Sequence, residues 1–271
     1  MSPMRKITLL VLWTRARFKL FLRTPRTAFF TVAFPLILLA LLNSLNEGQT
    51  VPGPNGADVA FATYFTPSIA IFGIVTSCYT AIVFSIATAR DRGILKRVMG
   101  TPVPAPIYLA SWALAAIATG LVSVSVLVIA GIVFFNVSID PVLIPAAAVT
   151  ALLGATCLSA LGLAVSSFVR KVESAPMVAN LTMFPVIFLS GVFFPINDAP
   201  GWVQDVANIL PVAHLVDAFT ACFDPATTGS GFSSDLWSLV LWTWIGLFVA
   251  ARRFRVEMTA AGGDARRPAT A

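Results

Sequence analysis

Apolar residues along the chain fall into six long runs, separated by shorter segments that carry nearly all of the charge. The runs span residues 27–45, 65–88, 107–135, 142–168, 175–195 and 235–251. Each is near or above the roughly 20 residues that an α-helix needs to cross a hydrocarbon core about 30 Å thick. The pattern therefore predicts an all-α membrane protein with six transmembrane helices.

Residues 4–26 show helical periodicity but hold too many cations for a membrane span. One side of this helix would carry Ile7, Leu10, Val11, Phe18, Phe21 and Leu22, and the other would carry Arg15, Lys19, Arg23 and Arg26. Such a helix suits the membrane surface, where apolar side chains enter the acyl boundary and cations meet anionic headgroups. We expect an N-terminal interfacial helix over 1–26; the alternative is a juxtamembrane leader without function.

Residues 201–222 are apolar enough to suggest a seventh span. Asp205 and Asp217 oppose this, because a charge at the centre of a span costs about 2.5–3.5 kcal/mol on insertion, and Pro211 lies between them. We expect two short amphipathic helices instead, forming an outer re-entrant hairpin over 197–223. Trp202 suits an interfacial anchor.

The composition supports a membrane location. The chain is 58% hydrophobic and only 11% charged, against about 25% charged residues in a soluble domain. The net charge of +6 does not indicate nucleic-acid binding, because the cations flank apolar spans. The three cysteines are scattered and predict neither a disulfide framework nor a metal site.

The positions of the cations predict the orientation. All 18 Lys and Arg residues lie before residue 27, in 89–106, in 169–174 or after residue 251, whereas the segments 46–64, 136–141 and 196–234 hold only acidic charges. Short cytoplasmic loops are enriched in Lys and Arg. We therefore expect both termini, including the tail 252–271, in the cytoplasm of a multi-pass protein of the cell membrane.

Residues 89–106 form the densest cationic cluster in the middle of the chain. In a helix, Ile94, Leu95 and Val98 would share one side, with Arg92, Lys96 and Arg97 around the rest. The prolines at 102, 104 and 106 then force a turn. This segment is either a short basic helix gripped by a cytosolic partner or an ordinary loop that only sets topology.

Motifs for chemistry on this chain are missing. None of the four lysines follows a glycine, so a phosphate-binding G-x-x-x-x-G-K-[ST] loop is absent, as are HExxH and GxSxG. The lone His214 is more often an interfacial polar residue than a catalyst or ligand. The first three runs contain no Asp or Glu, which argues against a proton-driven pump. Energy for any transport must then come from another chain.

Two segments resemble motifs of the type 2 ABC transporter permeases, of the daunorubicin-resistance-like group. Ala89-Arg-Asp-Arg-Gly-Ile-Leu-Lys-Arg-Val98 and Thr101-Pro102 resemble Glu-Arg-Glu-x-Gly-Thr-Leu-x-x-Leu followed by Thr-Pro. Ser190-Gly191-Val-Phe-Phe-Pro195, Pro200-Gly-Trp202 and Asn208-Ile-Leu-Pro211 resemble Ser-Gly-x-x-Phe-Pro, Pro-x-Trp and Asn-x-x-Pro. The chain departs from the family at Ala89, at the shorter Asp91, and at Ala110-Ser111, where Gly-Lys is often found.

The resemblance implies a non-enzymatic transport subunit of an exporter. ATP and Mg²⁺ would bind a separate cytosolic ATPase, so no cofactor is expected on this chain, and a second permease chain, identical or paralogous, would pair with it. The implied coupling helix is 90–102, within a permease domain of 27–251. It would use Arg90, Asp91, Arg92, Gly93, Ile94, Leu95, Lys96, Arg97, Val98, Thr101 and Pro102.

The same resemblance implies an exit gate at the outer hairpin, formed by Ser190, Gly191, Phe194, Pro195, Pro200, Trp202 and Pro211. An amphipathic drug or a lipid-like substrate would move outward between the two permeases. Two alternatives remain: a permease for a polysaccharide or similar polymer, and a membrane scaffold that transports nothing.

Overall fold

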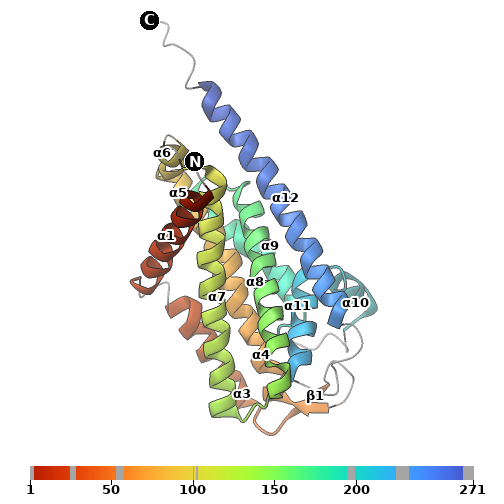
Figure 1. Ribbon diagram of the computed structural model, residues 1–271. Helices are drawn as coiled ribbons and strands as arrows, with labels where there is room; N and C mark the ends of the chain where they lie inside the picture. The colour runs from red at the N-terminus through yellow and green to blue at the C-terminus, as the bar shows by residue number, and fades with distance from the viewer. Residues whose placement is uncertain are drawn as a thin grey trace, which may run out of the picture.

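The computed structural model shows a bundle of helices with a long C-terminal helix along one side (Figure 1). It describes residues 3–24, 29–52, 58–99, 101, 103–193, 199–223 and 232–264. The first helix, α1 (Pro3–Leu22), packs on α7.

Two breaks in regular helix precede the first long span. A π-helical segment, η1 (Phe29–Ala33), leads into α3 (Phe34–Leu45). A small antiparallel hairpin then pairs β1 (Thr50–Pro52) with β2 (Asp58–Ala60), with Val51 opposite Val59. This hairpin lies at the end of the bundle opposite to α6.

The central helix of the bundle runs through Phe61–Asp91 in three parts: α4 (Phe61–Ile74), the π-helical η2 (Val75–Thr80) and α5 (Ala81–Asp91). A turn leads to α6 (Ile94–Met99), and α7 (Ala105–Phe135) returns across the bundle. Asn136 ends α7 in the left-handed conformation, with φ of 53°.

The second half of the chain begins with η3 (Pro141–Leu143) and α8 (Ile144–Ser166). A short turn, η4 (Val172–Ser174), leads to α9 (Ala175–Phe188). The helices α10 (Gly201–Ala207), α11 (Pro211–Thr220) and η6 (Ala221–Phe223) follow, and α12 (Phe232–Asp264) ends the described chain.

Within the residues that the structure describes, four helical segments are long and apolar enough to cross a membrane, and a fifth would be added if the bent pair α10–α11 were one span. The four are Phe61–Asp91, Pro106–Phe135, Pro141–Ser166 and Phe232–Phe254. The six predicted spans are therefore not all confirmed. The first and fifth are short apolar helices, Thr31–Leu45 and Val172–Phe188. The fifth ends early because Gly191, at φ of 76°, follows Phe188 in a turn that takes the chain out of the helix.

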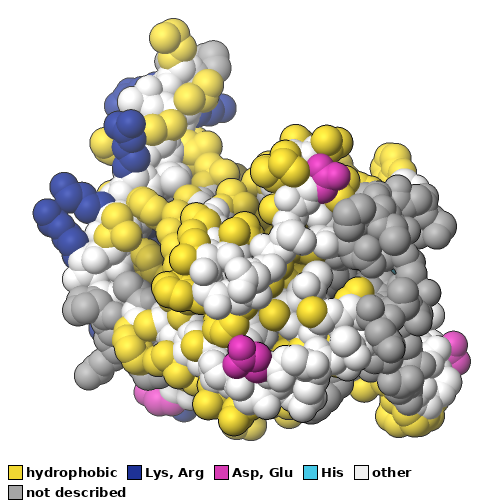
Figure 2. Space-filling view, turned by 90° about the horizontal axis from the view of Figure 1, so that it is seen from below, with side chains coloured by type: hydrophobic (Ala, Val, Ile, Leu, Met, Phe, Trp, Pro, Cys, Tyr) yellow, Lys and Arg dark blue, Asp and Glu magenta, His cyan; other side chains and the backbone are white. Residues whose placement is uncertain are grey.

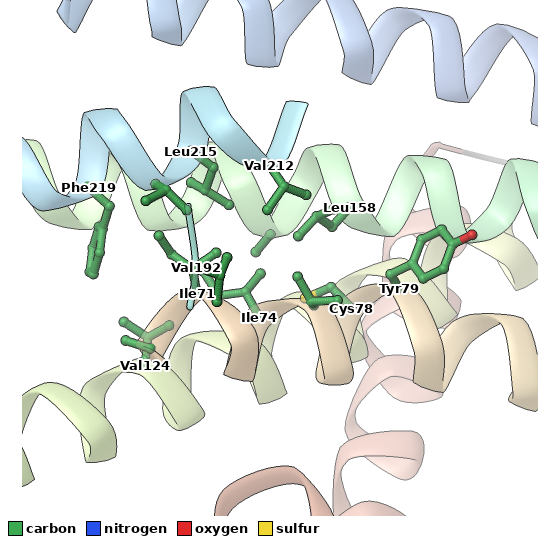
Figure 3. Packing of buried hydrophobic residues seen from close by; sticks show 14 of the residues in the cluster. Ile71, Ile74, Cys78, Tyr79, Val124, Leu158, Val192, Val212, Leu215 and Phe219 are labelled. Atoms are coloured by element: carbon green, nitrogen blue, oxygen red, sulfur yellow. The ribbon is translucent and has the colours of Figure 1, made fainter. Parts of the chain in front are cut away.

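The two helices predicted in 201–222 are present, and their axes differ by 90° at Pro211. The apolar side of α11 faces the protein interior. Val212, Leu215, Val216 and Phe219 are all buried against α4 and α8 (Figure 3). The hairpin is thus anchored by packing inside the bundle, and α11 turns its apolar residues away from lipid.

Close contacts in the bundle rely on glycine. A Cβ at Gly246 of α12 would lie 2.9 Å from the backbone of Ala160 and Leu161 in α8, and one at Gly162 would lie 3.0 Å from the carbonyl oxygen of Tyr79. Small residues let transmembrane helices approach this closely, which maximises van der Waals contact where no hydrophobic force acts between helices.

Candidate functional site

The turn between α5 and α6 lies at the same end of the molecule as the N-terminus (Figure 1). Gly93 has φ of 66°, a conformation that side chains disfavour, and its carbonyl oxygen accepts a hydrogen bond from the Arg97 N–H at 3.1 Å. The sequence places glycine where the chain must reverse between the two helices. The predicted helix over 90–102 is therefore two pieces: the end of α5 and the six-residue α6.

The two faces of α6 differ as the periodicity predicts, with one exception. Leu95 and Val98 are buried, and they belong to a cluster with Ile82, Tyr108 and residues of α8 and α12. Ile94 is 37% exposed and does not share their burial. Asp91, Arg92, Arg97 and Thr101 are exposed, and the Lys96 side chain and Pro102 lie outside the described part of the chain. The surface of this turn is polar and basic above an apolar base.

Arg90 differs from its neighbours because its guanidinium group turns inward. Nη1 donates to the carbonyl oxygen of Ser166 at 2.9 Å and also to that of Val169. The guanidinium carbon lies 5.9 Å from the ring centroid of Phe254 in α12. Ser166 is the last residue of α8 and Val169 lies just beyond it, so Arg90 joins the turn between α5 and α6 to the end of α8 and to α12.

The cations of α1 also include both exposed side chains and one that turns inward. Arg15, Lys19 and Arg23 are exposed, as the amphipathic pattern predicts, and Arg26 lies outside the described residues. Arg17 instead reaches into α7. Its guanidinium carbon lies 3.5 Å from the ring centroid of Trp112 and 4.6 Å from that of Tyr108, and Nε donates to the Ser111 hydroxyl oxygen at 3.0 Å.

At the opposite end, the residues proposed as a gate fall into two groups. Ser190 and Gly191 are buried, and the Gly191 carbonyl oxygen accepts a hydrogen bond from the Tyr64 hydroxyl at 2.8 Å. Phe194 and Pro195 lie outside the described residues.

The other residues proposed for the gate lie on the outer helical hairpin formed by α10 and α11. Pro200 precedes α10, and its carbonyl oxygen accepts from the Val203 N–H at 2.8 Å. Trp202 is 65% exposed, consistent with an interfacial anchor. Pro211 is buried at the first position of α11, where a proline fits because its missing N–H would have no helical partner.

His214 has a structural role that the sequence pattern did not reveal. Its Nδ1 lies 2.8 Å from a carboxylate oxygen of Asp235 in α12, and Nε2 lies 3.0 Å from the carbonyl oxygen of Asn208. The Trp242 indole N–H also donates to the carbonyl oxygen of Ile209 at 3.1 Å. These contacts join the hairpin to α12, and the separation of the partners along the chain leaves no local signal.

The described residues offer no cluster of side chains suited to a metal ion. They include no group of three or more His, Cys, Asp or Glu side chains that could hold a metal ion. Cys78, Cys157 and Cys222 are buried as free thiols in separate helices. The distinctive surface features are instead the basic turn at one end and the hairpin at the other.

Comparison with known proteins agrees with this architecture. Residues 8–223 match the model of the ABC-2 type transporter family. This chain belongs to that family. The match includes α1, the basic turn and the hairpin up to η6, so the type 2 permease resemblance of the sequence is confirmed.

Named relatives share a quarter or so of the residues. The inner membrane transport permease YadH of Escherichia coli is 23% identical over 59% of this chain and 62% of its own length. Nodulation protein J of Rhizobium meliloti is 29% identical over 69% and 70%, and "Probable multidrug ABC transporter permease YbhR" of E. coli is 24% identical over 73% and 56%. The match thus spans under two thirds of the length of YadH and YbhR.

Proposed function

We propose that this chain is the membrane permease subunit of an ATP-driven exporter, and that α6 with the preceding turn docks on a separate cytosolic ATPase. The observation that carries the proposal is that this turn has one buried apolar face and one exposed basic face. Leu95 and Val98 fix it to the bundle, while Arg92 and Arg97 are left exposed at its surface. A cationic surface that is packed firmly against the bundle can bind an acidic groove on a partner and transmit the movement of that partner to the helices.

Movement of this turn would reach the rest of the bundle through direct contacts. Arg90 connects the end of α5 to the end of α8, and Leu95 and Val98 pack with Tyr108 of α7 and Phe254 of α12. A push on α6 is therefore shared by four long helices. ATP and Mg²⁺ would bind the ATPase, and this chain would supply no catalytic group.

A second permease chain would complete the transport path. The side of α9 that carries Met177, Leu181, Phe184 and Phe188 is apolar and exposed. Such a face must meet either lipid or another apolar helix. Because α9 is also shorter than a full span, a second copy or a paralogue packed beside it would explain its place in the membrane.

The proposed substrate is an amphipathic drug or lipid-like molecule that moves outward past the hairpin. The similarity to YbhR, which is named as a probable multidrug ABC transporter permease, supports this choice over a polymer. Trp202, exposed on α10, would lie at the outer surface where such a molecule leaves.

Charge reversal tests the docking surface. Arg92→Glu, Lys96→Glu and Arg97→Glu together should reduce ATP-dependent efflux and the co-purification of the ATPase at least tenfold, because each contact changes from attraction to repulsion. Arg170→Glu with Lys171→Glu, at exposed cations of another turn, is the matched control and should leave both near normal. Normal efflux in the triple variant, with normal membrane insertion, would disprove the coupling role.

A further inference from the structure

A partly open cavity of about 180 Å³ lies where α1 leans on the bundle. Its walls come from α1, η1, the η2–α5 junction and α7. None of the predicted coupling or gate residues that the structure describes lines it. Its lining is mixed: apolar side chains such as Leu20, Phe21 and Ile82 occur together with Arg17 and Trp112.

Arg17 is held in one orientation at this cavity. The guanidinium carbon lies over both the Trp112 ring and the Tyr108 ring, so cation–π attraction restrains the group. Ser111 is fully buried and donates its own hydroxyl to the Tyr108 carbonyl oxygen at 2.6 Å, which fixes the oxygen that accepts from Arg17 Nε. The side chain is therefore preorganised before any ligand arrives.

Two of the residues that line the cavity each have a buried hydrogen-bond donor without an acceptor. These donors are Nη2 of Arg17 and Nε1 of Trp112, and no described residue accepts from either. Buried donors are nearly always paired, and an unpaired one costs about 1–3 kcal/mol, more when it is charged. No ion pair of Arg17 with a carboxylate occurs among the described residues. Burial lowers the pKa of Arg17, and the Tyr108 hydroxyl opposes this effect.

An aromatic clamp that serves stability alone would explain the stacking. It would not explain why two residues that line the same cavity each have an unpaired donor. An oxygen-rich anion would pair both donors and balance the charge, because guanidinium groups bind phosphate and carboxylate oxygens with a planar fork.

The size and the lining of the cavity limit the choice of ligand further. A volume of 180 Å³ equals roughly six water-sized volumes, and it is below the range of about 300–1,000 Å³ for drug-sized sites. It fits one phosphate with the first part of an acyl chain. Leu20, Phe21 and Ile82 would contact the chain, so a free inorganic anion would leave the apolar part of the lining unused.

We propose that this cavity binds the phosphodiester headgroup of an anionic lipid, with the phosphate on Arg17 Nη2 and Trp112 Nε1 and the start of an acyl chain against α1 and α5. This site is separate from the proposed docking surface and does not depend on ATP-driven export. It would fix α1 to the bundle at the membrane surface.

The test is titration of the full purified chain, in a neutral detergent, with dihexanoylphosphatidylglycerol. Arg17→Gln should weaken binding about ten- to a hundredfold, the loss expected for a charged hydrogen bond, and Trp112→Phe about two- to tenfold. Arg15→Gln removes an exposed cation from the same helix and is the matched control, with affinity within twofold of the wild type.

Two further measurements separate this proposal from the alternatives, which are binding of a free phosphate group and no binding site at all. Glycerol 3-phosphate, which lacks acyl chains, should bind at least tenfold more weakly; equal binding would overturn the lipid assignment. Ala116→Leu fills the cavity without touching a charge and should also abolish lipid binding, which keeps the test valid if Arg17→Gln fails to fold. Binding by folded Arg17→Gln or Ala116→Leu protein that matches the wild type would refute the site.

Discussion

At the scale of single residues, the two most informative cations are those that turn inward. Arg17 and Arg90 lie in segments where the sequence pattern predicts cations for the membrane surface or for a partner. Periodicity cannot separate them from Arg15 or Arg92, because the hydrogen-bond acceptors are distant in sequence: the Ser111 hydroxyl for Arg17 and the Ser166 carbonyl group for Arg90. Ser111, which marks a departure from the family motif, is the residue that holds Arg17.

Arg90 should contribute to stability more than its exposed neighbour. Arg90→Ala removes donors from the carbonyl groups of Ser166 and Val169, and charged hydrogen bonds are worth about 1.5–3 kcal/mol. We expect a clear fall in the melting temperature of the purified protein. Arg92→Ala, at an exposed position two residues later, should change it little, and equal losses in both would contradict the structural role of Arg90.

The pair of His214 and Asp235 gives a second prediction at this scale. His214→Ala and Asp235→Ala should each destabilise the hairpin, and the double variant should cost less than the two losses added together. Contacting residues of this kind show coupling of about 0.5–3 kcal/mol. Melting temperatures of the four proteins measure it, and strict additivity would show that the contact between α11 and α12 has no energetic weight.

At the scale of elements, the sequence predicts helix type and position well and helix length less well. Leu95, Val98 and the apolar side of α11 lie inward as the periodicity indicates. Within the described residues, the expected first span begins with the π-helical η1, and the expected fifth span ends where a turn that contains Gly191 follows α9. Hydropathy alone reports neither feature, since a π-helical segment and a turn can both consist of apolar residues.

The contact between α8 and α12 should be sensitive to a single methyl group. Gly246→Ala places a Cβ 2.9 Å from backbone atoms of α8, so the helices must separate, and overpacking of this kind costs about 1–3 kcal/mol. Gly201→Ala, where no atom lies within 4 Å, is the control. A thermal unfolding experiment should show a loss for the first and none for the second. An unchanged Gly246→Ala protein would show that α12 is loosely packed.

At the scale of the whole molecule, charge separates the two ends. The coupling turn, the N-terminus and the last turns of α12 share one end (Figure 1), and Lys and Arg appear only at the margin of the view from the β1 end, where acidic side chains are spread over the surface (Figure 2). The segregation was predictable from sequence because it needs only residue order. Which end faces the cytoplasm is a prediction of the positive-inside rule.

The orientation of the coupling turn is the central claim, because a cytosolic ATPase can reach it only from inside. Arg92→Cys and Asp205→Cys place thiols at exposed positions of the turn before α6 and of α10, while the native cysteines are buried. A membrane-impermeant maleimide should label position 205 in intact cells and position 92 only after permeabilisation. Labelling of position 92 from outside intact cells would contradict the account.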